Sequence, residues 1–123
     1  MSVPTKAIIE EVLNSLKKVG GITASAVVTR DGLLIASNVT GEVDAETFAA
    51  MTATMTGAAE TAMTEIQAGP LDRVIVEGKT AKIISVGAGP KVLLVVLAAS
   101  DAPLGLVLLK MGDTTRKIGK ILE

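Results

Sequence analysis

The stretch "AVVTRDGLLIAS", residues 26–37, places an Arg-Asp-Gly tripeptide between two apolar runs. Arg30, Asp31 and Gly32 predict a tight β-hairpin, because such a turn needs residues that accept positive backbone dihedral angles. The flanking runs, 22–29 and 33–37, are therefore predicted to be its two strands. Neither run alternates cleanly between apolar and polar residues, which indicates that both faces of the sheet are covered.

The rest of the chain alternates between helical and extended patterns with no linker between domains. A first helix is predicted from Pro4 to Gly20, and a long second helix is predicted from a cap at Asp44 to about residue 67. Strands are expected over 71–77, 80–86 and 91–99, and a last helix after a cap at Asp101. The predicted fold is a single α/β domain over residues 1–123, with order α-β-β-α-β-β-β-α and a five-stranded antiparallel sheet covered by helices on both faces.

Composition excludes several classes of function. The chain has no histidine and no cysteine, so we expect no metal site, no cofactor and no disulfide, and a cytoplasmic location. Twelve basic residues against thirteen acidic ones form no basic stripe, and Phe48 is the only aromatic residue, so nucleic acid is not an expected partner. Hydrophobic residues make up 49% of the chain, which favours exposed aliphatic surface and a protein partner.

No segment predicts a signal peptide or a membrane span. The first eighteen residues carry Glu10 and Glu11 within their apolar periodicity, unlike a secretion signal. The longest apolar region, 92–109, is interrupted by Asp101 and Pro103. We therefore expect no insertion into a membrane.

Three segments resemble the roadblock/dynein light chain domain family. They are "GGITASAVVTRDGLLIAS" (20–37), "VIVEG" (74–78) and "LLVVLAASDAPLGLVLLKM" (93–111), and the resemblance extends from Ile8 to Leu122. It rests on structural glycines and apolar strands, so it is specific for the fold and weak for the activity. The resemblance implies a roadblock or profilin-like sandwich, a homodimer or heterodimer joined edge to edge through its sheets, and a role in binding Ras-like small GTPases or in adapting motor complexes.

Two glycine-containing segments do not fit nucleotide-binding motifs. The segment "EGKT", 77–80, ends like a phosphate-binding loop, but that pattern requires glycine at the position of Arg73 and a helix after the loop. The segment "GAGP", 87–90, is predicted to turn into a strand rather than open a helix. Without an imidazole base, and with Glu10 and Glu11 interpreted as solvated, the chain is expected not to be an enzyme.

The second helix is the predicted partner-binding element. At 100° per residue one stripe is apolar and is expected to pack on the sheet; it contains Phe48, Met51, Met55, Ala59, Ala62 and Ile66. The opposite side is expected to offer a surface of low relief that a partner can approach closely; it contains Ala50, Ala53, Gly57, Glu60, Thr61 and Thr64. A drift in composition, or close helix pairing within a dimer, explains these small residues equally well, and the family resemblance favours a GTPase.

The segment "DRVIVEG", 72–78, predicts an edge strand through which two copies pair. Val74 and Val76 share one face, while Arg73, Ile75 and Glu77 share the other. In an antiparallel pair centred on Ile75, Arg73 of one copy lies opposite Glu77 of the other. Two unrelated edge charges in water are the alternative.

Taken with these features, the family resemblance implies a dimeric adaptor or regulator that binds the switch region of a Ras-like small GTPase and shifts its conformational populations. None of Arg30, Arg73 and Arg116 falls on the second helix, so we expect the GTPase's own residues, rather than an arginine finger, to carry any acceleration of hydrolysis. One alternative is a scaffold subunit that ignores nucleotide state. Another is a small-ligand sensor, for which the sequence indicates no pocket.

Overall fold

The computed structural model describes residues 4–39 and 41–123. Its order of elements is the predicted one, α-β-β-α-β-β-β-α. The elements are α1 (Thr5–Lys17), β1 (Ile22–Thr29), β2 (Leu34–Val39), α2 (Ala45–Glu65), β3 (Val74–Glu77), β4 (Ala81–Gly87), β5 (Val92–Ala99) and α3 (Leu104–Ile121).

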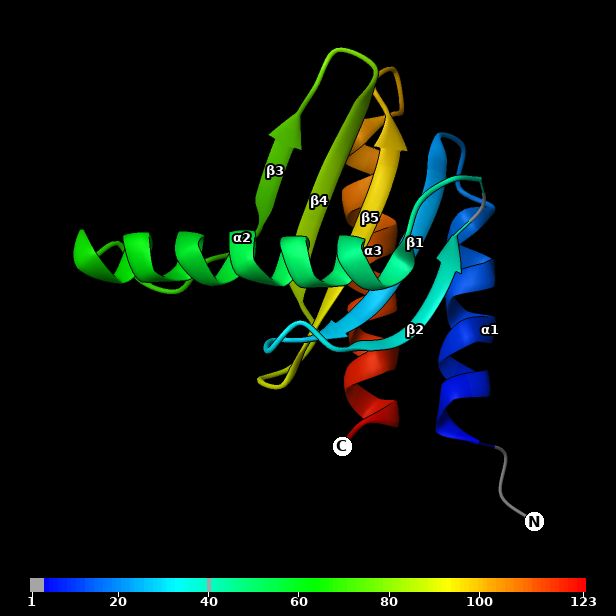
Figure 1. The fold of residues 1–123 in the computed structure, drawn as a ribbon, viewed down its shortest axis with the longest axis horizontal. Helices are drawn as coiled ribbons and strands as arrows, with labels where there is room; N and C mark the ends of the chain where they lie inside the picture. The colour runs from blue at the N-terminus through cyan, green and yellow to red at the C-terminus, as the bar shows by residue number, and fades with distance from the viewer. Residues whose placement is uncertain (1–3, 40) are drawn as a thin grey trace.

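The five strands form one antiparallel sheet in the order β2-β1-β5-β4-β3 (Figure 1). The central strand β5 is apolar throughout, and Leu94, Val95 and Val96 are fully buried because helices cover both faces. The strands β2 and β3 are the two edges. The predicted five-stranded sheet is therefore confirmed.

Helices α1 and α3 lie side by side on one face of the sheet, and α2 crosses the other face (Figure 1). The larger core lies beneath α1 and α3, where Ile9, Leu13, Met111 and Ile118 are fully buried. The core beneath α2 is smaller. Its buried members are Ala26, Val28, Ala49, Ala53, Leu93 and Val95.

Local turns and helix caps explain where most of the helices and strands begin and end. Gly32 has a φ of +94°, as the predicted β1–β2 hairpin requires. The carboxylate of Asp44 accepts hydrogen bonds from the backbone amides of Glu46 and Thr47, so it caps α2 as expected. The predicted cap at Asp101 is wrong: α3 starts after Pro103, whose fixed φ suits a helix entrance.

Candidate functional site

The orientation of α2 differs from the prediction. The residues of α2 that are buried against the sheet are Ala49, Thr52, Ala53 and Thr56. Met51 and Ile66, expected on the sheet, are 64% and 71% exposed. The side of α2 that faces the sheet therefore carries small side chains, which let the helix lie close to the strands. Part of the predicted packing stripe faces outward instead.

A buried hydroxyl pair fixes this orientation. The Oγ1 of Thr56 lies 2.7 Å from the Oγ of Ser85 on β4, and both residues are buried. Thr56 is also 2.8 Å from the carbonyl oxygen of Thr52 one turn earlier. Because a buried hydroxyl needs a hydrogen-bond partner, this pair fixes the rotation of α2 about its own axis, with Thr56 facing β4.

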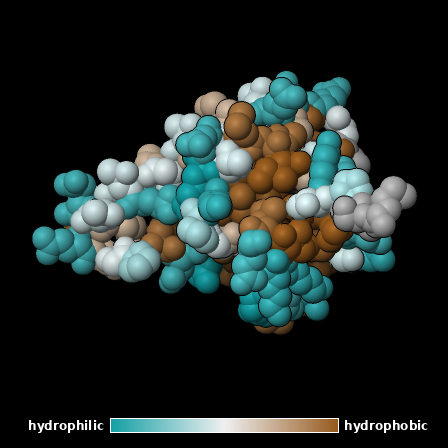
Figure 2. Space-filling model, turned by 90° about the horizontal axis from the view of Figure 1, so that it is seen from below, coloured by the Kyte–Doolittle hydropathy of each residue, from teal (hydrophilic) through white to brown (hydrophobic). Residues whose placement is uncertain are grey.

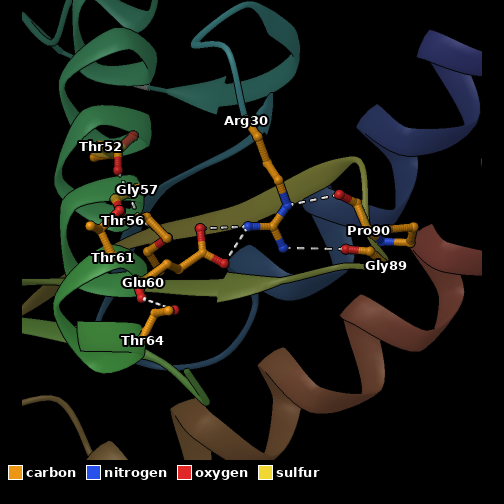
Figure 3. Close-up of polar contacts among 10 residues, drawn as sticks. Arg30, Thr52, Thr56, Gly57, Glu60, Thr61, Thr64, Gly89 and Pro90 are labelled. Carbon is orange, nitrogen blue, oxygen red and sulfur yellow. Dashed lines mark hydrogen bonds and ion pairs between the residues drawn. The ribbon is translucent and has the colours of Figure 1, made fainter. Parts of the chain in front are cut away.

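The rest of the predicted partner-binding surface is exposed except for the half-buried Glu60, and it is called the α2 flank below; it comprises Ala50, Gly57, Glu60, Thr61 and Thr64. Ala53 does not belong to it, because this residue is 5% exposed and packs against the sheet. The hydroxyls of Thr61 and Thr64 donate to the carbonyls of Gly57 and Glu60 within the helix (Figure 3). These two hydroxyls therefore lie against the helix and do not project from the α2 flank.

Arg30 reaches the α2 flank from the end of β1 (Figure 3). Its Nη1 lies 2.8 and 2.6 Å from the two carboxylate oxygens of Glu60, and its Nε donates to the carbonyl of Pro90 at 2.9 Å. Both side chains of the ion pair are about one-third to two-fifths exposed, at 34% and 41%. The guanidinium of Arg30 thus connects the β1–β2 turn with the β4–β5 turn and with α2. The ion pair between Arg30 and Glu60 was not predicted from the sequence.

The predicted dimer strand lies at an open edge of the sheet. Within the part of the chain that the structure describes, β3 pairs with β4 alone, with Ile75 opposite Ile84 and Val76 opposite Ile83. The strand starts at Val74, so Arg73 directly precedes it. Glu77 is 64% exposed and lies 3.7 Å from Lys82 of the same chain, so its carboxylate has a neighbour in the monomer.

Apolar surface lies close to this edge. Val76 is 41% exposed on the strand. The C-terminal half of α2 projects past β3 (Figure 1), and Thr61, Ala62 and Thr64 are exposed there. Ile66, directly after the last residue of α2, is exposed as well. The edge strand β3 and the projecting half of α2 therefore form one surface that a second sheet could cover.

The end of the molecule seen in Figure 2 carries a broad apolar surface bordered by hydrophilic residues. A groove of about 630 Å³ runs along β2, where Gly32 to Ser37 line it together with Lys6, Glu10 and Glu46. Leu33, which belongs to this lining, is 68% exposed. The groove combines an edge strand with charges of both signs, and it lies across the sheet from the β3 edge.

The described residues contain no group of three or more His, Cys, Asp or Glu side chains arranged to hold a metal ion. Over the same residues, no helix has the length and apolarity that crossing a bilayer requires.

Comparison with known sequences gives one family. The sequence profile of the Roadblock/LC7 domain matches residues 8–98. Two uncharacterized proteins of Methanocaldococcus jannaschii, MJ1340 and MJ0310, are each 43% identical to the chain over 110 residues, which cover 89% of this chain and 96% of theirs.

Comparison with solved structures supports the same fold. Myxococcus xanthus MglB has a TM-score of 0.89 at 24% identity, covering 99% of this chain and 92% of its own. A Roadblock/LC7 domain from Streptomyces avermitilis has a TM-score of 0.87 at 20% identity, covering 92% and 96%. Profilin IA of Acanthamoeba castellanii, at a TM-score of 0.60 and 16% identity, covers 95% and 98%, so the profilin-like layout is confirmed.

Proposed function

The chain belongs to the Roadblock/LC7 family, and on that premise we propose that it is a non-enzymatic, dimeric regulator that binds a Ras-like small GTPase. Protein binding is the general role that the family implies. The observation that carries the finer proposal is the α2 flank of mostly small side chains, on a helix that also exposes Met51 and, at its C-terminal end, Ile66. Such a helix is suited to close contact with other proteins on more than one side.

The open edge of β3 supports the proposed dimer. Antiparallel pairing of two β3 strands would extend one sheet across both copies and remove the unpaired backbone groups of the edge. The projecting half of α2 would then lie over the partner copy's side of the joined sheet. Both α2 helices would come to one face of the dimer, which doubles the surface offered to a GTPase.

Regulation would act through conformation. Arg30 lies beside the α2 flank, but its guanidinium is held by Glu60 and by the carbonyl of Pro90. Arg116 forms an ion pair with Asp113 on α3, on the other face of the sheet. The proposal therefore assigns the chemistry of hydrolysis to the GTPase and assigns this chain a preference for one state of the switch region.

The test measures binding of purified Ras-like GTPases from the same organism, each loaded with GDP or a non-hydrolysable GTP analogue. Binding to one nucleotide state, with a changed rate of single-turnover hydrolysis, is the expected result. Equal affinity for both states would replace the regulator by a nucleotide-independent scaffold. Absence of binding to every such GTPase would overturn the proposal.

A further inference from the structure

The outer face of the α1–α3 layer carries a groove between the two helices, on the side of the sheet opposite α2. Its volume is about 470 Å³. Its apolar lining includes Val12, Val19 and Leu106, of which Leu106 is 43% exposed. The groove is therefore separate from the α2 flank and from the β3 edge.

Lysines surround this apolar lining. Lys18 comes from the end of α1, and Lys110 and Lys117 lie about two turns apart on one side of α3. Of the residues that the structure describes, none of these three takes part in an ion pair within 4 Å. The single acidic side chain of the lining, Asp113, is paired with Arg116, so the charge that faces the groove is positive.

Folding separates charge across the whole domain. The α1 and α3 segments, residues 4–18 and 103–123, hold seven of the twelve basic residues and four of the thirteen acidic ones. The rest of the chain is correspondingly acidic, which hides this asymmetry in the net charge of −1. The sequence gives no basic stripe because these lysines come from the two ends of the chain and meet only in the folded layer.

We propose that this groove binds an amphipathic helical segment of a partner protein, with apolar residues along one face and Asp or Glu beside them. The apolar ridge would contact Val12, Val19 and Leu106, and the carboxylates would face Lys18, Lys110 and Lys117. The stretch of α3 from Leu106 to Lys117 extends about 17 Å at 1.5 Å per residue, which matches about three turns of a third helix.

Shape distinguishes this partner from an anionic membrane. A bilayer presents a flat surface and would be contacted by the outermost side chains, whereas the apolar groups here line a hollow between two helices. A helix that enters the hollow covers these groups and brings carboxylates to the lysines at its margins. The domain would then hold two proteins at once, one on each face of its sheet.

The test uses a synthetic helical peptide with leucines at i, i+3 and i+7 flanked by glutamates, and a matched peptide with lysines in place of the glutamates. The ¹⁵N-labelled protein is titrated with each peptide and, separately, with vesicles of phosphatidylglycerol and phosphatidylcholine. We expect the acidic peptide to bind, with amide shifts confined to residues 12–20 and 106–117. No binding, equal binding of the lysine peptide, or shifts elsewhere would overturn the proposal.

Charge reversal supplies the control. The double variant Lys110→Glu, Lys117→Glu should weaken binding of the acidic peptide by roughly tenfold or more, while Lys79→Glu, Lys91→Glu makes the same change in net charge away from the groove and should leave it unchanged. An equal loss in both variants would show a general effect of charge and contradict the site. Tighter binding to the vesicles than to the acidic peptide would assign the surface to a membrane and contradict the proposal as well.

Discussion

The guanidinium of Arg30 and the carboxylate of Glu60 are thirty residues apart in the chain and form an ion pair with Nη1–oxygen distances of 2.8 and 2.6 Å. Glu60 belongs to the half of α2 that projects towards and past the edge of the sheet (Figure 1). Because the same guanidinium also donates to the carbonyl of Pro90, it ties this half of the helix to the turns at one end of the sheet.

Replacing Arg30 by alanine should loosen the C-terminal half of α2. We expect the free energy of unfolding to fall by only about 1 kcal/mol, because the pair is partly exposed to solvent. Amide hydrogen exchange should accelerate in residues 57–65 and stay unchanged in α1. Arg30→Lys keeps the charge but loses the forked geometry, so an intermediate rate is expected; unchanged exchange in both variants would contradict the role of this contact.

The hydroxyl pair between Thr56 and Ser85 predicts an asymmetry. Ser85→Ala leaves the Thr56 hydroxyl bonded to the carbonyl of Thr52, whereas Thr56→Val leaves the Ser85 hydroxyl buried without a partner. We expect Thr56→Val to lower the free energy of unfolding by about 1–3 kcal/mol and Ser85→Ala by less than that. Urea denaturation measures both, and an equal or reversed order would contradict this account.

The fold was predictable because its signals are local. The Arg30–Gly32 turn, the Asp44 cap and the uniformly apolar fifth strand each act over a few residues, and each is present as expected. The start of β3 at Val74 rather than residue 71 is a difference at a strand end, where pairing with β4 decides the boundary.

The side of α2 that packs on the sheet was not predictable from hydropathy. That method assigns the largest apolar side chains to the core, and here Met51 and Ile66 remain outside while Thr52 and Thr56 face the strands. Threonine can do so because its hydroxyl bonds back to its own helix or to Ser85. The pairing of Arg30 with Glu60 depends on where α2 crosses the hairpin ends, which no local pattern encodes.

Gly57 provides a test that separates stability from binding. A methyl group added at Gly57 meets no atom within 4 Å, so Gly57→Ala should raise the free energy of unfolding by about 1 kcal/mol through helix propensity alone. If a GTPase approaches the α2 flank closely, the same methyl group should weaken its binding by roughly tenfold.

The matched control for Gly57→Ala is Gly112→Ala, in the interior of α3. There the added methyl group would contact only the Arg116 guanidinium, at 3.9 Å, so a similar gain in stability is expected without any effect on GTPase affinity. Thermal unfolding and nucleotide-dependent binding are measured on both variants. A stabilised Gly57→Ala protein with unchanged affinity would remove Gly57 from the binding surface.

The edge of β3 predicts the outcome of a charge exchange. Glu77→Lys should weaken dimerisation, because it places like charges opposite each other where Arg73 of one copy faces position 77 of the other. Arg73→Glu in the same chain should restore the dimer. Light scattering after size exclusion gives the mass of each variant over a range of concentrations.

The ion pair of Glu77 with Lys82 within one chain requires its own control. Glu77→Lys also removes this pair, so Lys82→Ala, which removes it without changing the charges at the edge, should leave the mass of the dimer unaltered. The Lys82 side chain is only 17% exposed, so Lys82→Ala also removes its packed aliphatic stem and should lower the stability of each protomer, but it should not separate the two copies. A monomer in Lys82→Ala, or a dimer that persists in Glu77→Lys, would contradict pairing of two copies through Arg73 and Glu77.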